Sequence, residues 1–148
     1  MSERPLLADY PHVTTLTTRW DDNDVYGHIN NVTYYSYFDS VANAFLIEQG
    51  GLDIHASPVI GLVVESWCQF HAPAEYPAQL RAGLRVDRLG EKAVTYGLAI
   101  FECDHDDAVA HGYFTHVFVD RSSRSSTAIP SGIRDALETL LTASARTD

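Results

Sequence analysis

The sequence predicts an α+β fold in which an antiparallel sheet curls around one long helix. Two observations lead to this prediction. Between residues 31 and 50, apolar side chains recur with the three-four spacing of a helical face, at Tyr34, Tyr37, Phe38, Val41, Ala42, Phe45 and Leu46. After this helix, the apolar pattern changes to the two-residue period of strands that follow one another as a meander. With 148 residues, 45% of them hydrophobic, the chain suits a single domain spanning residues 1–148.

The expected elements follow in chain order. Residues 12–20 are rich in Thr and suit a strand, and a polar turn over 21–27 leads to the helix. Asn30 or Asn31 caps this helix, and Gly50 with Gly51 ends it. Four long strands come next, over 59–71, 79–88, 93–103 and 108–120, and a short amphipathic helix over 131–143 follows Pro130. Because the edges of such a sheet of about five strands need protection, we expect a homodimer or homotetramer.

Charge and hydropathy restrict the partners and the location. Ten basic residues against twenty acidic ones give a net charge of −10, which would repel the phosphates of a nucleic acid. No apolar run is long enough to span a membrane, and the first residues lack the apolar core of a signal peptide. We therefore expect a cytoplasmic protein with no membrane span. Cys68 and Cys103 lie inside apolar stretches, so we interpret them as small buried residues without a disulfide or zinc role.

Several common kinds of catalytic site have no counterpart in the sequence. The patterns GxGxxG, GxxxxGK[ST], HExxH and GxSxG are all absent. The histidines lack metal-ligand spacing, and His111 and His116 are an odd number of residues apart on one strand, so they face opposite sides. The run from Asp22 opens like a calcium loop but lacks its bidentate Glu. We expect neither a metal nor a cofactor.

The densest polar cluster lies between the first strand and the long helix, and it comprises Asp21, Asp22, Asn23, Asp24, His28, Asn30 and Asn31. One interpretation is a solvated turn with helix caps, because Asp and Asn favour both roles. In the other, free N–H groups at the positive end of the helix hold a carbonyl oxygen. A carboxylate about seven residues earlier in the chain then faces them, and Gly27 allows the backbone to turn closely. The second arrangement suits acyl transfer without a cofactor.

The run from Asp22 to Asn31 reads D-x-D-x-x-G-H-x-N-N, and aromatic residues with an acid, Asp39, follow it. This pattern resembles the signature of the 4-hydroxybenzoyl-CoA thioesterase-like branch of the hotdog fold. A Pro-containing turn over 73–77 and a closing strand that begins at His111 fit the same family, and the resemblance covers roughly residues 14–140. It implies an antiparallel sheet wrapped around one aromatic-rich helix. It also implies an acyl-CoA thioesterase that releases a carboxylic acid and free CoA, with CoA present only as part of the substrate.

The resemblance also implies roles for individual residues. It places the catalytic carboxylate on Asp24, as nucleophile or as general base, and the oxyanion donor on the backbone N–H of Asn31. His28 is a further catalytic candidate. Three residues near the motif are candidate substrate contacts: Gly27, Asn30 and Tyr34. Asp22 is interpreted as an acid of the surface turn, with orientation of Asp24 or a raised Asp24 pKa as the alternative. Asp39 is one methylene shorter than the Glu that the family often has.

Two groups outside the motif are also candidate substrate contacts. Glu65 shares a predicted strand face with Val63 and Trp67, and it marks either a site or a face that reaches solvent or the oligomer contact. Coenzyme A carries phosphates, which guanidinium and ammonium groups bind. Four basic residues are concentrated in one strand and the following turn: Arg81, Arg85, Arg88 and Lys92. Ordinary exposed strand charges are the alternative interpretation.

Two other functions remain open from the sequence. A hotdog enoyl-CoA hydratase or dehydratase uses an Asp and a His five residues apart, or a His paired with a Glu on the helix. Here Asp24 and His28 are four apart, and Asp39 is the only acid of the helix before Glu48. The third possibility is an acyl-CoA-binding module that retains the fold without catalysis.

Overall fold

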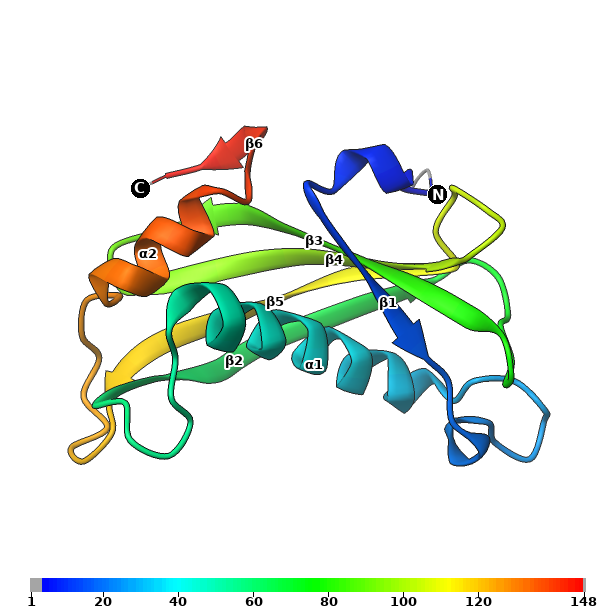
Figure 1. Ribbon diagram of the computed structural model, residues 1–148, viewed down its shortest axis with the longest axis horizontal. Coiled ribbons are helices and arrows are strands. Elements are labelled where there is room, and N and C mark those ends of the chain that lie inside the picture. Colours follow the sequence, from blue (N-terminus) through cyan, green and yellow to red (C-terminus); the bar gives the residue numbers. More distant parts are fainter. Residues whose placement is uncertain (1–3, 148) are drawn as a thin grey trace.

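The computed structural model describes residues 4–147, which form one curved antiparallel sheet around a long helix (Figure 1). The elements in chain order are η1 (Leu7–Asp9), β1 (His12–Thr17), η2 (Trp20–Asp22), α1 (Asn31–Gly50), β2 (Val59–Phe70), β3 (Gln79–Leu89), β4 (Ala93–Glu102), β5 (Ala110–Asp120), α2 (Ser131–Glu138) and β6 (Leu141–Arg146). The helix α1 lies across the concave face of the sheet, and α2 with β6 lies at one end. This architecture confirms the predicted α+β hotdog fold.

The strand order differs in one respect from the predicted meander. The sheet runs β1-β3-β4-β5-β2, so β3, β4 and β5 are neighbours as predicted, but β2 pairs with β5 and not with β3. After β2, the backbone N–H groups of His71 and Ala72 both donate to Val109 O, at 2.8 and 3.2 Å, so this segment stays beside the start of β5. The prediction of a hairpin between these two strands was therefore wrong, and β2 forms an edge of the sheet.

Both ends of the chain also differ from the predicted boundaries. The first strand ends at Thr17, and Trp20–Asp22 form a short 3₁₀ helix. The last helix ends at Glu138 rather than at residue 143, because Thr139 Oγ1 donates to Ala136 O at 2.6 Å and closes the turn. Residues 141–146 then form β6, which pairs in parallel with β3. A sixth strand was not predicted.

Burial of α1 against the sheet follows the predicted spacing. All seven apolar positions predicted for the helix face are buried. On β3, the alternating residues Leu80, Ala82, Leu84 and Val86 are all fully buried. Burial of one large apolar side chain contributes about 1.5–3 kcal/mol, so this contact supplies much of the folding free energy. The C-cap Gly51, with φ of 72°, ends the helix where the sequence predicts.

The two faces of the sheet carry different side chains, and the face turned away from α1 is called here the outer face. His116 is buried at 2% exposure and shares a 2.9 Å hydrogen bond with the Tyr96 hydroxyl, whereas His111 packs against Trp67 on the outer face. The prediction that His111 and His116 face opposite sides is confirmed. The prediction that Glu65 shares a strand face with Val63 is wrong. A register shift between these two residues turns Glu65 to the outer face, while Val63 faces α1.

Two further observations concern the cysteines and membrane-spanning helices. Cys68 and Cys103 are both free, but Cys103 is exposed in the turn after β4, so its predicted burial was wrong. Within residues 4–147, no helix is long and apolar enough to cross a membrane.

The buried His116 predicts how stability depends on pH. Desolvation by burial lowers its pKa from 6.5 to about 4, so the unfolded chain binds more protons between these values. The free energy of unfolding therefore falls as the pH drops through this range. We compare the decrease in the free energy of unfolding between about pH 7 and about pH 5. We expect this decrease to be about 2 kcal/mol smaller in His116→Gln than in the original protein. Urea unfolding of both proteins at the two pH values measures this difference, and equal losses would contradict the prediction.

Candidate active site

The polar loop before α1 is fixed by a buried carboxylate. Asp22 is only 3% exposed, and its Oδ2 accepts hydrogen bonds from the Tyr37 hydroxyl at 2.8 Å and from Arg19 N at 2.9 Å. Its carbonyl oxygen accepts from Asn30 N at 2.9 Å. The prediction that Asp22 is a surface acid was therefore wrong, because Tyr37 reaches it from the helix and compensates its burial. Burial and this hydrogen bond raise the pKa of Tyr37, which keeps the hydroxyl protonated as a donor.

The first turn of α1 presents a free donor. The Asn30 side chain caps the helix by accepting from Val32 N at 2.9 Å, and its carbonyl oxygen accepts from Thr33 N at 2.9 Å. Among the described residues, no acceptor binds the N–H of Asn31, which lies at the positive end of a 20-residue helix. This group can hold a carbonyl oxygen on which negative charge develops.

Asp24 lies in a tight turn that glycine makes possible. Gly27 has a φ of 85°, the left-handed conformation, and its N–H donates to Asp24 O at 3.0 Å. The Oδ1 of Asp24 accepts from Tyr26 N at 2.9 Å, whereas Oδ2 has no partner among the described residues. The carboxylate is therefore oriented through one oxygen and available to a ligand through the other.

One cavity, here called the motif cavity, brings four of the predicted residues together. It has a volume of about 660 Å³ and is lined by Asp24, Tyr26, His28, Ile29, Asn31, Tyr34, Phe70, His71, Ala72 and Pro73. Gly27 and Asn30 line an adjoining hollow, which shares Asp24 and Tyr26 with the motif cavity. Tyr34 packs edge-on against Phe70, with ring centroids 5.4 Å apart, and burial raises its pKa to about 12.

Phe70 and His71 line this cavity but were not among the predicted site residues. The expected strand over 59–71 includes both residues, and the Pro-containing turn begins two positions later. Local pattern does not indicate that the end of this strand lies beside the start of α1. That placement follows from the pairing of β2 with β5 at the edge of the sheet.

The four basic candidates lie in two separate places. Arg81 binds the carbonyl oxygen of His105 at 2.8 Å and pairs with Asp106, and Arg85 pairs with Asp87 at 2.7 Å. Arg85 also lies over the Tyr10 ring. Arg88 and Lys92 instead line a hollow of about 400 Å³ near the turn between β3 and β4, together with Glu65, Thr95 and Thr115. None of the four basic residues lines the motif cavity.

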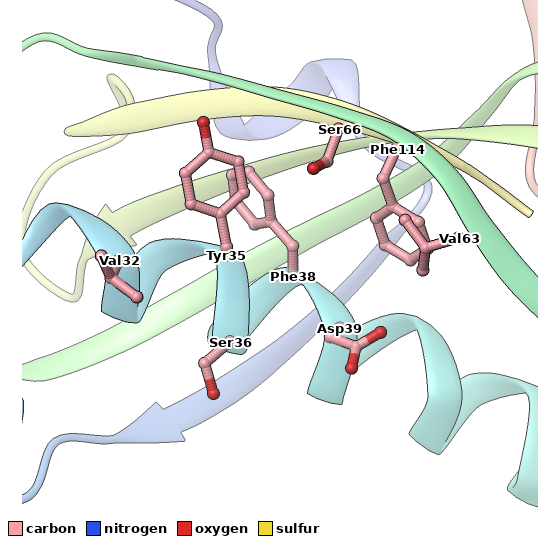
Figure 2. A pocket seen from close by; sticks show the side chains of 8 residues that line it. All are labelled: Val32, Tyr35, Ser36, Phe38, Asp39, Val63, Ser66 and Phe114. Carbon is pink, nitrogen blue, oxygen red and sulfur yellow. The ribbon is translucent and has the colours of Figure 1, made fainter.

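A second, more apolar cavity lies between α1 and β2, and is here called the helix–strand cavity. It has a volume of about 400 Å³ and is lined by Val32, Tyr35, Ser36, Phe38, Asp39, Val63, Ser66 and Phe114. Figure 2 shows Tyr35 and Phe38 rising from α1 toward the strands, with Val63 and Phe114 beside them. Asp39 lines this cavity and not the motif cavity, and its Oδ1 accepts from Asn43 Nδ2 at 3.1 Å. Within residues 4–147, no three His, Cys, Asp or Glu side chains are grouped so as to hold a metal ion.

Comparison with known proteins gives the family and the fold. Residues 18–137 match the model of the thioesterase-like superfamily. The PA5185 protein from Pseudomonas aeruginosa strain PAO1 is 51% identical over 95% of this chain and 98% of its own, with a TM-score of 0.93. The PA2801 protein from Pseudomonas aeruginosa is 27% identical over 86% of this chain and 98% of its own, with a TM-score of 0.79. The gentisyl-coenzyme A thioesterase BH1999 is 22% identical over 85% of this chain and 99% of its own, with a TM-score of 0.75.

No match was found among curated proteins. The family match nevertheless spans most of the chain, including the motif loop, α1 and strands β2 to β5. The likeness to BH1999 supports the same fold. The chain therefore belongs to the thioesterase-like superfamily and is a thioester hydrolase with the hotdog fold.

Proposed function

We propose that the protein hydrolyses an acyl-CoA thioester to a carboxylic acid and free CoA in the motif cavity. The observation that carries this proposal is that Asp24 and Asn31 line one cavity, the first with a free carboxylate oxygen and the second with a free backbone N–H. BH1999 acts on a coenzyme A thioester, which supports this substrate class.

In the proposed reaction, the Asn31 N–H binds the thioester carbonyl oxygen and stabilises the charge that develops there. Asp24 acts in one of two ways. As a general base, it removes a proton from the water that attacks the carbonyl carbon. As a nucleophile, it forms an anhydride that water then cleaves. Single turnover in ¹⁸O-labelled water detects the nucleophilic route when water attacks the Asp24 carbonyl carbon of the anhydride, since only that path leaves the label in the Asp24 carboxylate.

Arg88 and Lys92 are the proposed contacts of the coenzyme A phosphates. They line the same hollow of about 400 Å³ near the β3–β4 turn. A guanidinium group beside an ammonium group suits a doubly charged phosphate.

Self-association through β2 is also part of the proposal. This strand is 12 residues long; within residues 4–147 it has β5 on one side and no strand on the other. Exposed apolar side chains follow it and the adjacent side of α1: Val32, Tyr35, Ile47, Leu62, Val63, Val64, Trp67 and Phe70. Pairing with β2 of a second copy would satisfy the free backbone groups and cover the apolar side chains, including those of the helix–strand cavity.

We expect Asp24→Asn to lower the kcat for an acyl-CoA by about 10²–10⁴-fold, because an amide neither accepts the proton of water nor attacks the carbonyl. Affinity for the substrate should change little, since Asn retains the shape of the side chain. Thiol release from short, medium, long and aromatic acyl-CoAs measures the first quantity, and calorimetric titration measures the second. Asp21→Asn is the matched control, because Asp21 is an exposed acid of the same loop that does not line the motif cavity.

Turnover by Asp24→Asn at the original rate would contradict the assignment of Asp24. If the original protein binds an acyl-CoA but hydrolyses none of the panel, the proposed acyl-CoA hydrolysis is wrong.

We expect Val64→Asp to weaken self-association by about tenfold or more, because two copies of the strand would place charges at an apolar contact. Val64 is 61% exposed on β2. Sedimentation velocity over a range of concentrations measures the effect. Ile54→Asp serves as the control, since Ile54 is 56% exposed on the loop between α1 and β2 and receives the same charge. If Val64→Asp self-associates as strongly as the original protein, β2 is excluded as the contact between the copies.

A further inference from the structure

Two histidine side chains form a direct hydrogen bond at the end of β2. His71 Nε2 lies 2.7 Å from His111 Nδ1, and the two ring planes are inclined by only 7°. The backbone holds both residues in place: His71 N donates to Val109 O at 2.8 Å, and His111 pairs with Gln69 in the β2–β5 register. At this separation one proton lies between the two nitrogens, so one ring donates while the other accepts.

This pair connects the motif cavity with the outer face of the sheet. His71 lines the cavity together with Asp24 and Asn31. His111 is not among the lining residues, and its ring packs edge-on against Trp67, with centroids 5.5 Å apart. The second nitrogens, Nδ1 of His71 and Nε2 of His111, have no hydrogen-bond partner among the described residues. A proton that enters the pair at one of these nitrogens can therefore leave it at the other.

The pKa of each ring lies below the ordinary histidine value. Burial lowers the pKa of His71, and the charge of Arg4 lowers it further. Burial likewise lowers the pKa of His111, with additional effects of His71 and Arg85. The titratable or charged groups on the surrounding elements are Asp24 and His28 of the motif loop, Tyr34 of α1, Arg4 of the N-terminal segment, Arg85 of β3, Glu65 of β2 and Tyr113 of β5. On β4, the residue opposite His111 is Ala99.

We propose that His71 donates the proton taken up by the sulfur of the leaving coenzyme A, and that His111 resupplies His71 from the outer face. The proposal rests on the proposed hydrolysis of an acyl-CoA. In the donating tautomer, His111 Nδ1–H donates to His71 Nε2, so the second proton of the pair is on His71 Nδ1. His71 is then a catalytic residue, and His111 is a positioning residue that sets its tautomer.

As the carbon–sulfur bond breaks, its electron pair goes to sulfur, which takes the proton from His71 Nδ1. The proton of His111 Nδ1 moves to His71 Nε2, and water at the outer face supplies a proton to His111 Nε2. In the general-base route, the pair resets when His71 Nδ1 takes up the proton that Asp24 removed from the attacking water. His111 Nε2 then returns its proton to the outer face, and no net charge accumulates.

Two thioesters with the same acyl group test this role, one of coenzyme A and one of an aryl thiol. An alkyl thiolate is a stronger base than an aryl thiolate, so only the coenzyme A ester needs a proton donor. We expect His71→Asn to lower kcat on the acyl-CoA by about 10–100-fold and to leave kcat on the aryl thioester unchanged. His111→Asn should also lower kcat on the acyl-CoA and leave kcat on the aryl thioester unchanged. His55→Asn, on the loop after α1, is the matched control and should change neither rate.

An equal loss on both thioesters would show that His71 only shapes the cavity, and an unchanged rate on the acyl-CoA would exclude proton donation. Either result overturns the proposal while the hydrolase function stands. If the original protein hydrolyses no thioester, the proposed function fails, and this inference fails with it.

The original protein provides a test that does not depend on the folding of a variant. Nitrogen-15 spectra of the imidazole groups should show both rings neutral near pH 7, with a coupling between the nitrogens across the shared proton. Two rings that titrate independently near the ordinary histidine pKa of about 6.5 would overturn the proposal.

Discussion

The packing of α1 against the concave face of the sheet is the contact on which the rest of the structure depends. Seven apolar side chains of this helix are buried, and they need another element to cover them. The curved sheet lies over that side of the helix (Figure 1). This packing places the start of α1 beside the end of β2. The free N–H of Asn31 and the strand residues Phe70 and His71 therefore meet in one cavity.

The loop before α1 is held by the same contact. Tyr37 lies on the buried side of the helix and donates to Asp22, so the position of the carboxylate depends on the packing of the helix. Asp22 in turn accepts from Asn30 N and Arg19 N and fixes both ends of the loop. Between them, the left-handed Gly27 turns the chain so that Asp24 lines the cavity. A buried polar network of this kind gives a surface loop a defined geometry.

The two faces of the sheet make different contacts. The inner face binds α1, while the outer face carries the Arg81 and Arg85 contacts, with Arg85 reaching the N-terminal Tyr10. His71 lies where the two faces meet at the end of β2, and its partner His111 lies on the outer face. A residue at that position can exchange protons with the cavity and with solvent on opposite sides of the sheet.

The helix, the alternation on β3 and the turn at Gly27 are predictable from local sequence, because caps, periods and turn residues are local properties. The pairing of β2 with β5, the strand over residues 141–146 and the burial of Asp22 depend instead on contacts between distant segments. The period of the apolar pattern shows which residues of a strand share a face. It does not show which other strand pairs with that strand. The shift between Val63 and Glu65 shows the same limit, since one extra residue reverses the faces that follow it. The meeting of His71 with His111 likewise depends on pairing between segments 40 residues apart.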